Sequence, residues 1–220
     1  MSATDYTNIK NIGRLFRRLA DLGYIHPEEI PSIDLYMDQV TTFMDEHLKT
    51  SKRFDTDKIL TKTMINNYAK NNLLPPPVKK KYSKDHMILL IFIYYMKNIM
   101  SIGDIQELLN PISEQYFDGK GEIPLTEIYL EIMNFLKQEQ DGLFRYVKNE
   151  FRSSETLFCD TSADIPEEER EDLRRFAFIC YLAFDVYLKK LMIETLIDDS
   201  KPAAKKGPES KSSEKASKKQ

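Results

Sequence analysis

The chain has 220 residues, of which 41% are hydrophobic and 11% aromatic, so it can build a buried core. It contains only two cysteines, which form no C-x-x-C pair, and no histidine stands at metal-ligand spacing, so a disulfide scaffold and a zinc module are not expected. A P-loop, a dinucleotide fingerprint and a nucleophile elbow are also missing. The sequence therefore predicts a non-enzymatic protein without a cofactor or metal site.

The net charge of −3 is distributed unevenly along the chain. Residues 52–86 hold nine Lys or Arg and three Asp or Glu, a local charge of +6. Residues 111–199 hold ten basic and twenty acidic residues, a charge of −10, and residues 200–220 carry +5 from seven Lys and two Glu. Because the field near a binding surface depends on nearby charges, segment 52–86 is a candidate for binding a polyanion.

Two stretches are strongly apolar, residues 87–96 and 176–188. Both are shorter than the roughly 20 apolar residues that a membrane span needs. The first 23 residues lack the continuous apolar core of a signal peptide. We therefore expect a cytoplasmic protein that does not bind a membrane, with both stretches as buried helices.

Helical periodicity begins at residues 5–22, which place apolar residues on one face. Ser32 is expected to cap a second helix that runs to about Leu48. Its predicted inward-facing residues are Ile33, Tyr36, Met37, Val40, Phe43, Met44 and Leu48. Residues 49–60 are polar and basic, which is typical of a connection.

Thr61 is the expected N-cap of a short helix over residues 62–71, with Met64, Ile65 and Tyr68 turned inward. Asn72 can adopt the left-handed conformation that ends a helix. After Leu73 and Leu74, three prolines at 75–77 forbid further helix. Residues 78–82 then predict a short, extended, basic segment.

Ser83 is expected to cap a helix over residues 84–99, with His86 placed to complete the cap. This helix is apolar on nearly every side, as in a central core helix. Ser101 begins a helix that should end at Leu109, before Pro111. Its expected buried face is Ile102, Ile105, Leu108 and Leu109.

Beyond residue 110 the pattern predicts two long helices, from Thr126 to about 151 and from 167 to about 197. The expected inward residues of the first are Ile128, Tyr129, Ile132, Met133, Leu136, Leu143, Phe144 and Val147. A Lys-rich tail at 200–220 should be disordered. The predicted organisation is an N-terminal region (1–110) containing a basic module at about 32–110, an acidic helical region (111–199) for dimerisation or sensing, and the tail.

The order of helix, leucine pair, basic segment, long core helix and short helix resembles the winged helix-turn-helix of MerR-type regulators. LTKTMINNYAKNNLLPPP at 60–77 resembles the recognition helix, and KKKYSKDHMILLIFIYYMKNIMSIGDIQELL at 79–109 resembles the wing and following helices. The segment is still more similar to an uncharacterised bacterial family, domain of unknown function 1836, through its T-M-I-N-N-Y-x-K and K-K-K-Y-S patterns. The resemblance implies an all-α, MerR-like winged helix-turn-helix fold with N-terminal helices and a helical C-terminal half, and no established activity.

The chain departs from the MerR pattern at positions that bear on DNA binding. Asn66 and Asn67 stand where that family has Arg and Tyr, and Lys80 replaces the Arg of the wing. Asn72 and Ile99 each replace a glycine. Loss of the Arg removes a bidentate phosphate contact, so each module should bind weakly by itself.

Twelve residues are candidates for contact with double-stranded DNA. Asn can pair with adenine, and Lys can reach guanine or a phosphate. The candidates are Thr61, Lys62, Thr63, Asn66, Asn67, Tyr68 and Lys70 of the helix and Lys79, Lys80, Lys81, Tyr82 and Lys84 of the wing and the helix that follows it. Solvated charge and ordinary surface polarity are the alternatives for the Lys run and the Asn pair.

Two functions are compatible with this sequence. The first is a DNA-binding transcriptional regulator whose C-terminal helix, residues 172–197, forms a homodimer, as in MerR-type proteins. The second is a helical protein–protein interaction module that does not bind DNA. The aromatic stripe at Phe176, Phe178, Tyr181, Phe184 and Tyr187 indicates a core or a dimer seam rather than a ligand cage.

Overall fold

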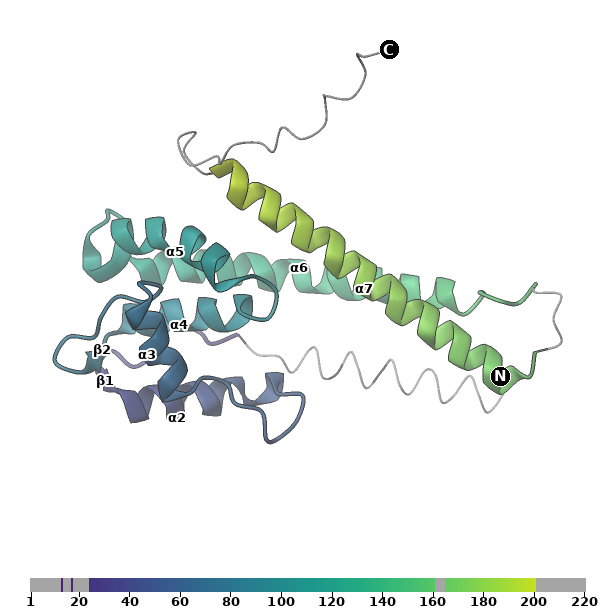
Figure 1. Cartoon of the computed structure of the whole chain (residues 1–220), viewed down its shortest axis with the longest axis horizontal. Coiled ribbons are helices and arrows are strands. Elements are labelled where there is room, and N and C mark those ends of the chain that lie inside the picture. The colour runs from purple at the N-terminus through teal and green to yellow at the C-terminus, as the bar shows by residue number, and fades with distance from the viewer. Residues whose placement is uncertain (1–12, 14–16, 18–23, 161–164, 201–220) are drawn as a thin grey trace, which may run out of the picture.

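The computed structural model of the chain describes residues 24–160 and 165–200, together with Gly13 and Arg17 (Figure 1). The helix expected at 5–22, apart from those two residues, and the tail at 201–220 lie outside the described residues. The described part is mostly helical, as the sequence predicts. In chain order its elements are β1 (Leu35–Tyr36), α2 (Met37–Leu48), the 3₁₀ turn η1 (Lys49–Ser51), α3 (Lys62–Lys70), β2 (Lys81–Tyr82), α4 (Lys84–Met96), α5 (Ile102–Tyr116), the 3₁₀ turn η2 (Phe117–Gly119), α6 (Leu125–Ser154) and α7 (Glu167–Ser200).

The helix expected to start after Ser32 begins at Met37, so its predicted cap is wrong. The preceding residues form β1 instead, which pairs antiparallel with β2. Ile33 and Tyr36 were expected to face inward, yet they are 69% and 54% exposed. The remaining face is as predicted, with four buried residues: Val40, Phe43, Met44 and Leu48.

Helix α3 begins where the sequence predicts and ends at Lys70, one residue earlier than predicted. The Thr61 hydroxyl accepts a hydrogen bond from the Met64 amide at 3.2 Å, which satisfies one of the unpaired donors of the first turn. Asn72 is left-handed, with φ of 56°. The amides of Leu73 and Leu74 both donate to the Tyr68 carbonyl, which turns these two side chains into the core. Leu73 and Leu74 therefore end α3 and pack its C-terminal end against the core.

The basic segment after the prolines is not extended throughout, contrary to expectation. Lys79 and Lys80 are left-handed, with φ of 52° and 66°. Val78 and Lys81 exchange backbone hydrogen bonds of 3.1 and 2.9 Å around them. Positive φ at both central residues is the signature of a type I′ turn, which reverses the chain within two residues. We call residues 78–82 the wing.

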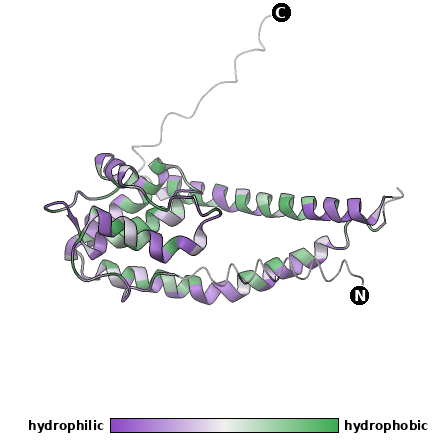
Figure 2. Ribbon diagram, turned by 90° about the horizontal axis from the view of Figure 1, so that it is seen from below, coloured by the Kyte–Doolittle hydropathy of each residue, from purple (hydrophilic) through white to green (hydrophobic). Residues whose placement is uncertain are grey.

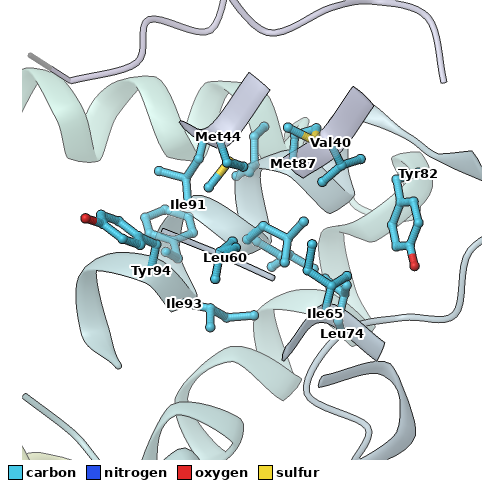
Figure 3. Close-up of a cluster of buried hydrophobic side chains, with 14 of the residues drawn as sticks. Val40, Met44, Leu60, Ile65, Leu74, Tyr82, Met87, Ile91, Ile93 and Tyr94 are labelled. Carbon is cyan, nitrogen blue, oxygen red and sulfur yellow. The ribbon is translucent and has the colours of Figure 1, made fainter. Parts of the chain in front are cut away.

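Helix α4 forms the centre of the core, as its all-round apolar pattern predicts (Figure 3). Every residue from His86 to Tyr94 is buried. In Figure 3 the labelled side chains of α4 converge with Val40 and Met44 of α2 and Ile65 of α3. The basic module therefore has a single core made by helices that surround α4.

Helix α5 runs to Tyr116, although Pro111 was expected to end it. A proline inside a helix costs about 3 kcal/mol because it removes a hydrogen bond and its ring clashes with the preceding turn. Ile112 and Tyr116, which follow it, pack against the core and offset that cost. On its first turns Ile105 and Leu109 are buried, but Ile102 and Leu108, expected to be buried, are 41% and 39% exposed.

The first turns of α6 belong to the same core. Leu125, Tyr129 and Met133 are buried, and the Tyr129 hydroxyl donates to the Ile25 carbonyl at 2.6 Å. Burial raises the pKa of Tyr129, so this hydroxyl keeps its proton. The core thus continues past residue 110. The inward positions predicted further along are wrong at three residues, which are 39–48% exposed: Ile132, Leu136 and Leu143.

Helix α7 crosses α6 and continues over α5 (Figure 1). The Phe178 and Phe151 rings lie 5.3 Å apart where α7 meets α6, and the Lys190 ammonium donates to the carbonyl of Ile99, which precedes α5. Figure 2 shows hydrophobic residues recurring along the long helices. The expected burial of residues 176–188 is wrong for most large apolar residues of the single chain, which are exposed, but Phe178 is buried. Among the described helices, none combines the length and apolar character needed to cross a bilayer.

Candidate nucleic-acid interface

The solvent face of α3 is polar and cationic. Ile65 and Tyr68 point into the core, so the helical repeat turns the residues between them outward. Five predicted contact residues are exposed on this face: Lys62, Thr63, Asn66, Asn67 and Lys70. The structure therefore brings these five residues together on one surface of α3.

Two candidates are excluded from this surface by burial. Tyr68 and Tyr82 are only 7% and 2% exposed, and burial raises the pKa of both phenols. Both rings pack in the core, so little of either side chain is exposed for the predicted contact with DNA. Thr61 is half-buried, and its hydroxyl is used by the α3 cap. Lys84 is half-buried at the start of α4.

The wing lies beside the start of α2, because β1 leads directly into that helix. Lys79 and Lys80 are exposed at the turn. Lys81 is half-buried, since its ammonium lies 5.1 Å from the centre of the Tyr36 ring. The three lysines therefore differ: two are exposed at the turn, and the third lies against an aromatic ring.

A second contact joins α3 to the same part of α2. The Lys62 ammonium forms an ion pair with the Asp38 carboxylate in the first turn of α2. Tyr36 and Asp38 thus link the wing and α3 to a single short segment. Sequence reasoning missed both residues, because Tyr36 was assigned to a buried helix face. The alternation of Leu35 and Tyr36 was the one available signal, and it spans only two residues.

The base of the wing is held by the cap of α4. The Ser83 amide donates to His86 Nδ1 at 3.0 Å, and the His86 ring meets Tyr82 and Phe117 edge-on at 5.4 and 4.7 Å. Burial lowers the pKa of His86, and the carbonyls of Pro75 and Pro76 and the charge of Asp85 act in the opposite direction. A neutral His86 accepts the Ser83 hydrogen bond, which fixes Tyr82 and with it strand β2.

The chemistry available on this surface is binding. Ammonium groups can contact phosphates, and the Asn66 and Asn67 amides can donate to and accept from base edges. Within the described residues no group of three or more His, Cys, Asp and Glu side chains could hold a metal ion. Both cysteines, Cys159 and Cys180, are exposed and lie far along the chain in the C-terminal half.

Comparison with known proteins identifies a domain but not an activity. The family model described as a domain of unknown function, DUF1836, matches residues 25–132. No curated protein and no solved structure matches the chain. The matched segment begins at Ile25 and includes Tyr129, the two residues joined by the buried hydrogen bond between the start of the described chain and α6. Residues 25–132 include α3, the wing and most of the core around α4. This segment is therefore a DUF1836 domain.

Proposed function

We propose that the protein binds duplex DNA through α3 and the wing, as a transcriptional regulator of MerR-like winged helix-turn-helix type. The observation that supports this most is the pairing of two exposed features on one packed module. One is the polar face of α3, with Asn66 and Asn67, and the other is the wing turn, with Lys79 and Lys80.

In this proposal α3 enters the major groove, which is about 12 Å wide and admits a helix. Asn66 and Asn67 read adenine edges, while Lys62 and Lys70 reach guanine or phosphate. The wing lysines contact the backbone, which adds affinity without sequence readout. Residues 49–61 between α2 and α3 are longer than the three or four residues of a typical helix-turn-helix. They replace the tight turn, and the Asp38–Lys62 ion pair connects the start of α3 to the first turn of α2.

We further propose that α7 forms a homodimer. A helix that is apolar on most sides is normally enclosed by others, yet most of α7 is open to solvent. Nine of its large apolar residues are 41–69% exposed: Phe176, Ile179, Phe184, Val186, Tyr187, Leu188, Leu191, Met192 and Leu196. A second copy would cover part of this surface and double the +6 charge of the basic segment. The doubled charge would offset the weak DNA binding expected of each module by itself.

The test is binding of the full chain to labelled genomic duplex fragments by fluorescence anisotropy over a range of KCl concentrations. The affinity should fall steeply, with a log–log slope of about −0.9 for each phosphate neutralised. The triple variant Lys79→Ala, Lys80→Ala, Lys81→Ala should bind more weakly and with a shallower slope. Absence of binding by the unmodified chain at low salt rejects DNA binding.

A second candidate function is protein–protein interaction without DNA binding. It is favoured by the same apolar surface of α7 and by the neutralisation of Lys62 by Asp38. In that case the triple lysine variant would bind a partner protein as tightly as the unmodified chain, and neither would bind DNA. A map of genomic sites occupied in cells separates the two, since an interaction protein leaves it blank.

A further inference from the structure

A cross-strand pair at the base of the wing turn joins an aromatic ring to a cation. Tyr36 and Lys81 are opposite residues of β1 and β2, and the Lys81 ammonium lies 5.1 Å from the Tyr36 ring centre. The neighbouring pair, Leu35 and Tyr82, is buried. Because successive strand residues point to opposite faces, Tyr36 and Lys81 lie on the solvent side, where Tyr36 remains 54% exposed.

Both ends of this pair are fixed in place. The Tyr36 amide donates to Gln39 Oε1 at 2.8 Å, which ties the residue to the first turn of α2. Lys81 closes the wing turn through its two backbone bonds with Val78. The turn holds Lys79 and Lys80 in left-handed conformations that non-glycine residues rarely adopt and that cluster at binding sites.

We infer that Tyr36 is a positioning residue of the DNA-binding surface: its ring holds the Lys81 ammonium for a backbone phosphate and packs against the sugar–phosphate chain. This inference rests on the proposed function. A lysine on a free stem loses rotamer freedom when it binds, and a ring that restricts it beforehand reduces that loss. The surface then offers phosphates one preorganised cation, Lys81, beside two exposed ones, Lys79 and Lys80.

A Tyr–Lys pair can also serve only to stabilise the strand ladder, so the test must separate the two roles. Tyr36→Leu removes the ring, and Tyr36→Phe keeps it. The chain supplies a matched control beyond the far end of α2, a 12-residue helix about 18 Å long. There the Arg53 guanidinium lies 5.1 Å from the ring of Phe54, which is 58% exposed. Phe54→Leu removes an equivalent pair away from the wing.

The experiment measures anisotropy of a labelled mixed-sequence duplex across KCl concentrations, with a thermal unfolding curve for each variant. Tyr36→Leu should weaken binding about threefold to tenfold, the range expected for loss of an exposed cation–π contact and its phosphate. Its salt slope should be shallower by about 0.9, one phosphate. Tyr36→Phe should restore most of the affinity and slope, and Phe54→Leu should match the unmodified chain.

Each contrary result has a distinct meaning. No DNA binding by the unmodified chain overturns both the proposed function and this inference. Binding by the unmodified chain with unchanged affinity and slope in Tyr36→Leu overturns the inference alone, as does an equal loss in Phe54→Leu. If Tyr36→Leu does not fold, Lys81→Ala provides the readout, and an unchanged salt slope in that variant overturns the inference.

Discussion

The Lys62 ammonium at the start of α3 forms an ion pair with the Asp38 carboxylate in the first turn of α2. Both side chains remain largely exposed, at 60% and 75%. The pair therefore contributes little to stability. Its main consequence is electrostatic, because it neutralises one cation on the face of α3 that we propose meets DNA.

Replacing Asp38 with Asn should increase DNA affinity about 1.4-fold to fivefold, in keeping with the roughly 0.2–1 kcal/mol of an exposed pair. The change frees Lys62 and removes an anion from the neighbourhood of the phosphates. Fluorescence anisotropy at a fixed KCl concentration measures the change in DNA affinity. Asp45→Asn is the control, since it breaks the 2.6 Å pair with Lys52 at the other end of α2. Equal gains in both variants would assign the effect to net charge.

At the wing turn, we predict that a substitution that increases stability weakens DNA binding. Changing Lys79 to Asn and Lys80 to Gly should raise the free energy of unfolding by about 1–2 kcal/mol, because Asn and Gly tolerate the left-handed region at lower cost. The same variant should bind DNA more weakly, having lost two cations. Urea denaturation and anisotropy measure the two effects. A lowered unfolding midpoint would contradict the turn conformation.

The hydrogen bond from Tyr129 to the Ile25 carbonyl tests whether α6 stabilises the basic module. Tyr129→Phe leaves that buried carbonyl without its partner and should cost about 1–2 kcal/mol in urea unfolding. Tyr146→Phe is the control, because the Tyr146 hydroxyl contacts Tyr181 on a surface where Tyr146 is 44% exposed. That change should shift stability by less than about 0.5 kcal/mol. Similar costs for both would argue against a special role for Tyr129.

The lowered pKa of His86 predicts a loss of stability in mild acid. The unfolded chain binds a proton near the ordinary pKa of about 6.5, whereas the folded chain resists protonation because the ring is buried. The contribution is therefore complete above pH 6.5 and declines as the pH falls toward the folded pKa. His86→Gln, which can retain the cap, should flatten this part of the stability–pH curve, and the exposed His26→Gln should not. An unchanged stability–pH curve in His86→Gln would show that groups other than His86 cause the acid sensitivity.

The proposed homodimer predicts that charge on the outer face of α7 separates the copies. Phe184→Glu combined with Met192→Glu should convert a dimer to a monomer in sedimentation equilibrium, since both residues are more than half exposed, at 58% and 64%. Phe135→Glu on α6, where Phe135 is 61% exposed, is the control and should leave the dimer intact. A monomeric unmodified chain would reject the homodimer.

Several parts of the site could be predicted because they depend on neighbouring residues. The caps at Thr61, Ser83 and Ser101 each use groups three residues apart, and each is present. The left-handed Asn72 and the burial of Leu73 likewise follow from local chain geometry. Together these local features made it possible to predict which residues of α3 face outward.

Other features depend on partners distant in the sequence. The two-residue strands have no periodicity to detect, so only the pairing across 45 positions revealed that Tyr36 faces Lys81. Helix α5 continues past Pro111 because later residues pack on the core, a gain that local propensity does not contain.

The amino-acid sequence by itself determined the helical content, the centrality of α4 and the cationic face of α3, because these follow from side-chain spacing along one helix. The tertiary structure alone decided that Tyr82 is buried and that much of α7 stays exposed. Burial depends on how much surface the remaining chain can cover. The core around α4 covers Tyr82, whereas α5 and α6 contact α7 along only part of its surface.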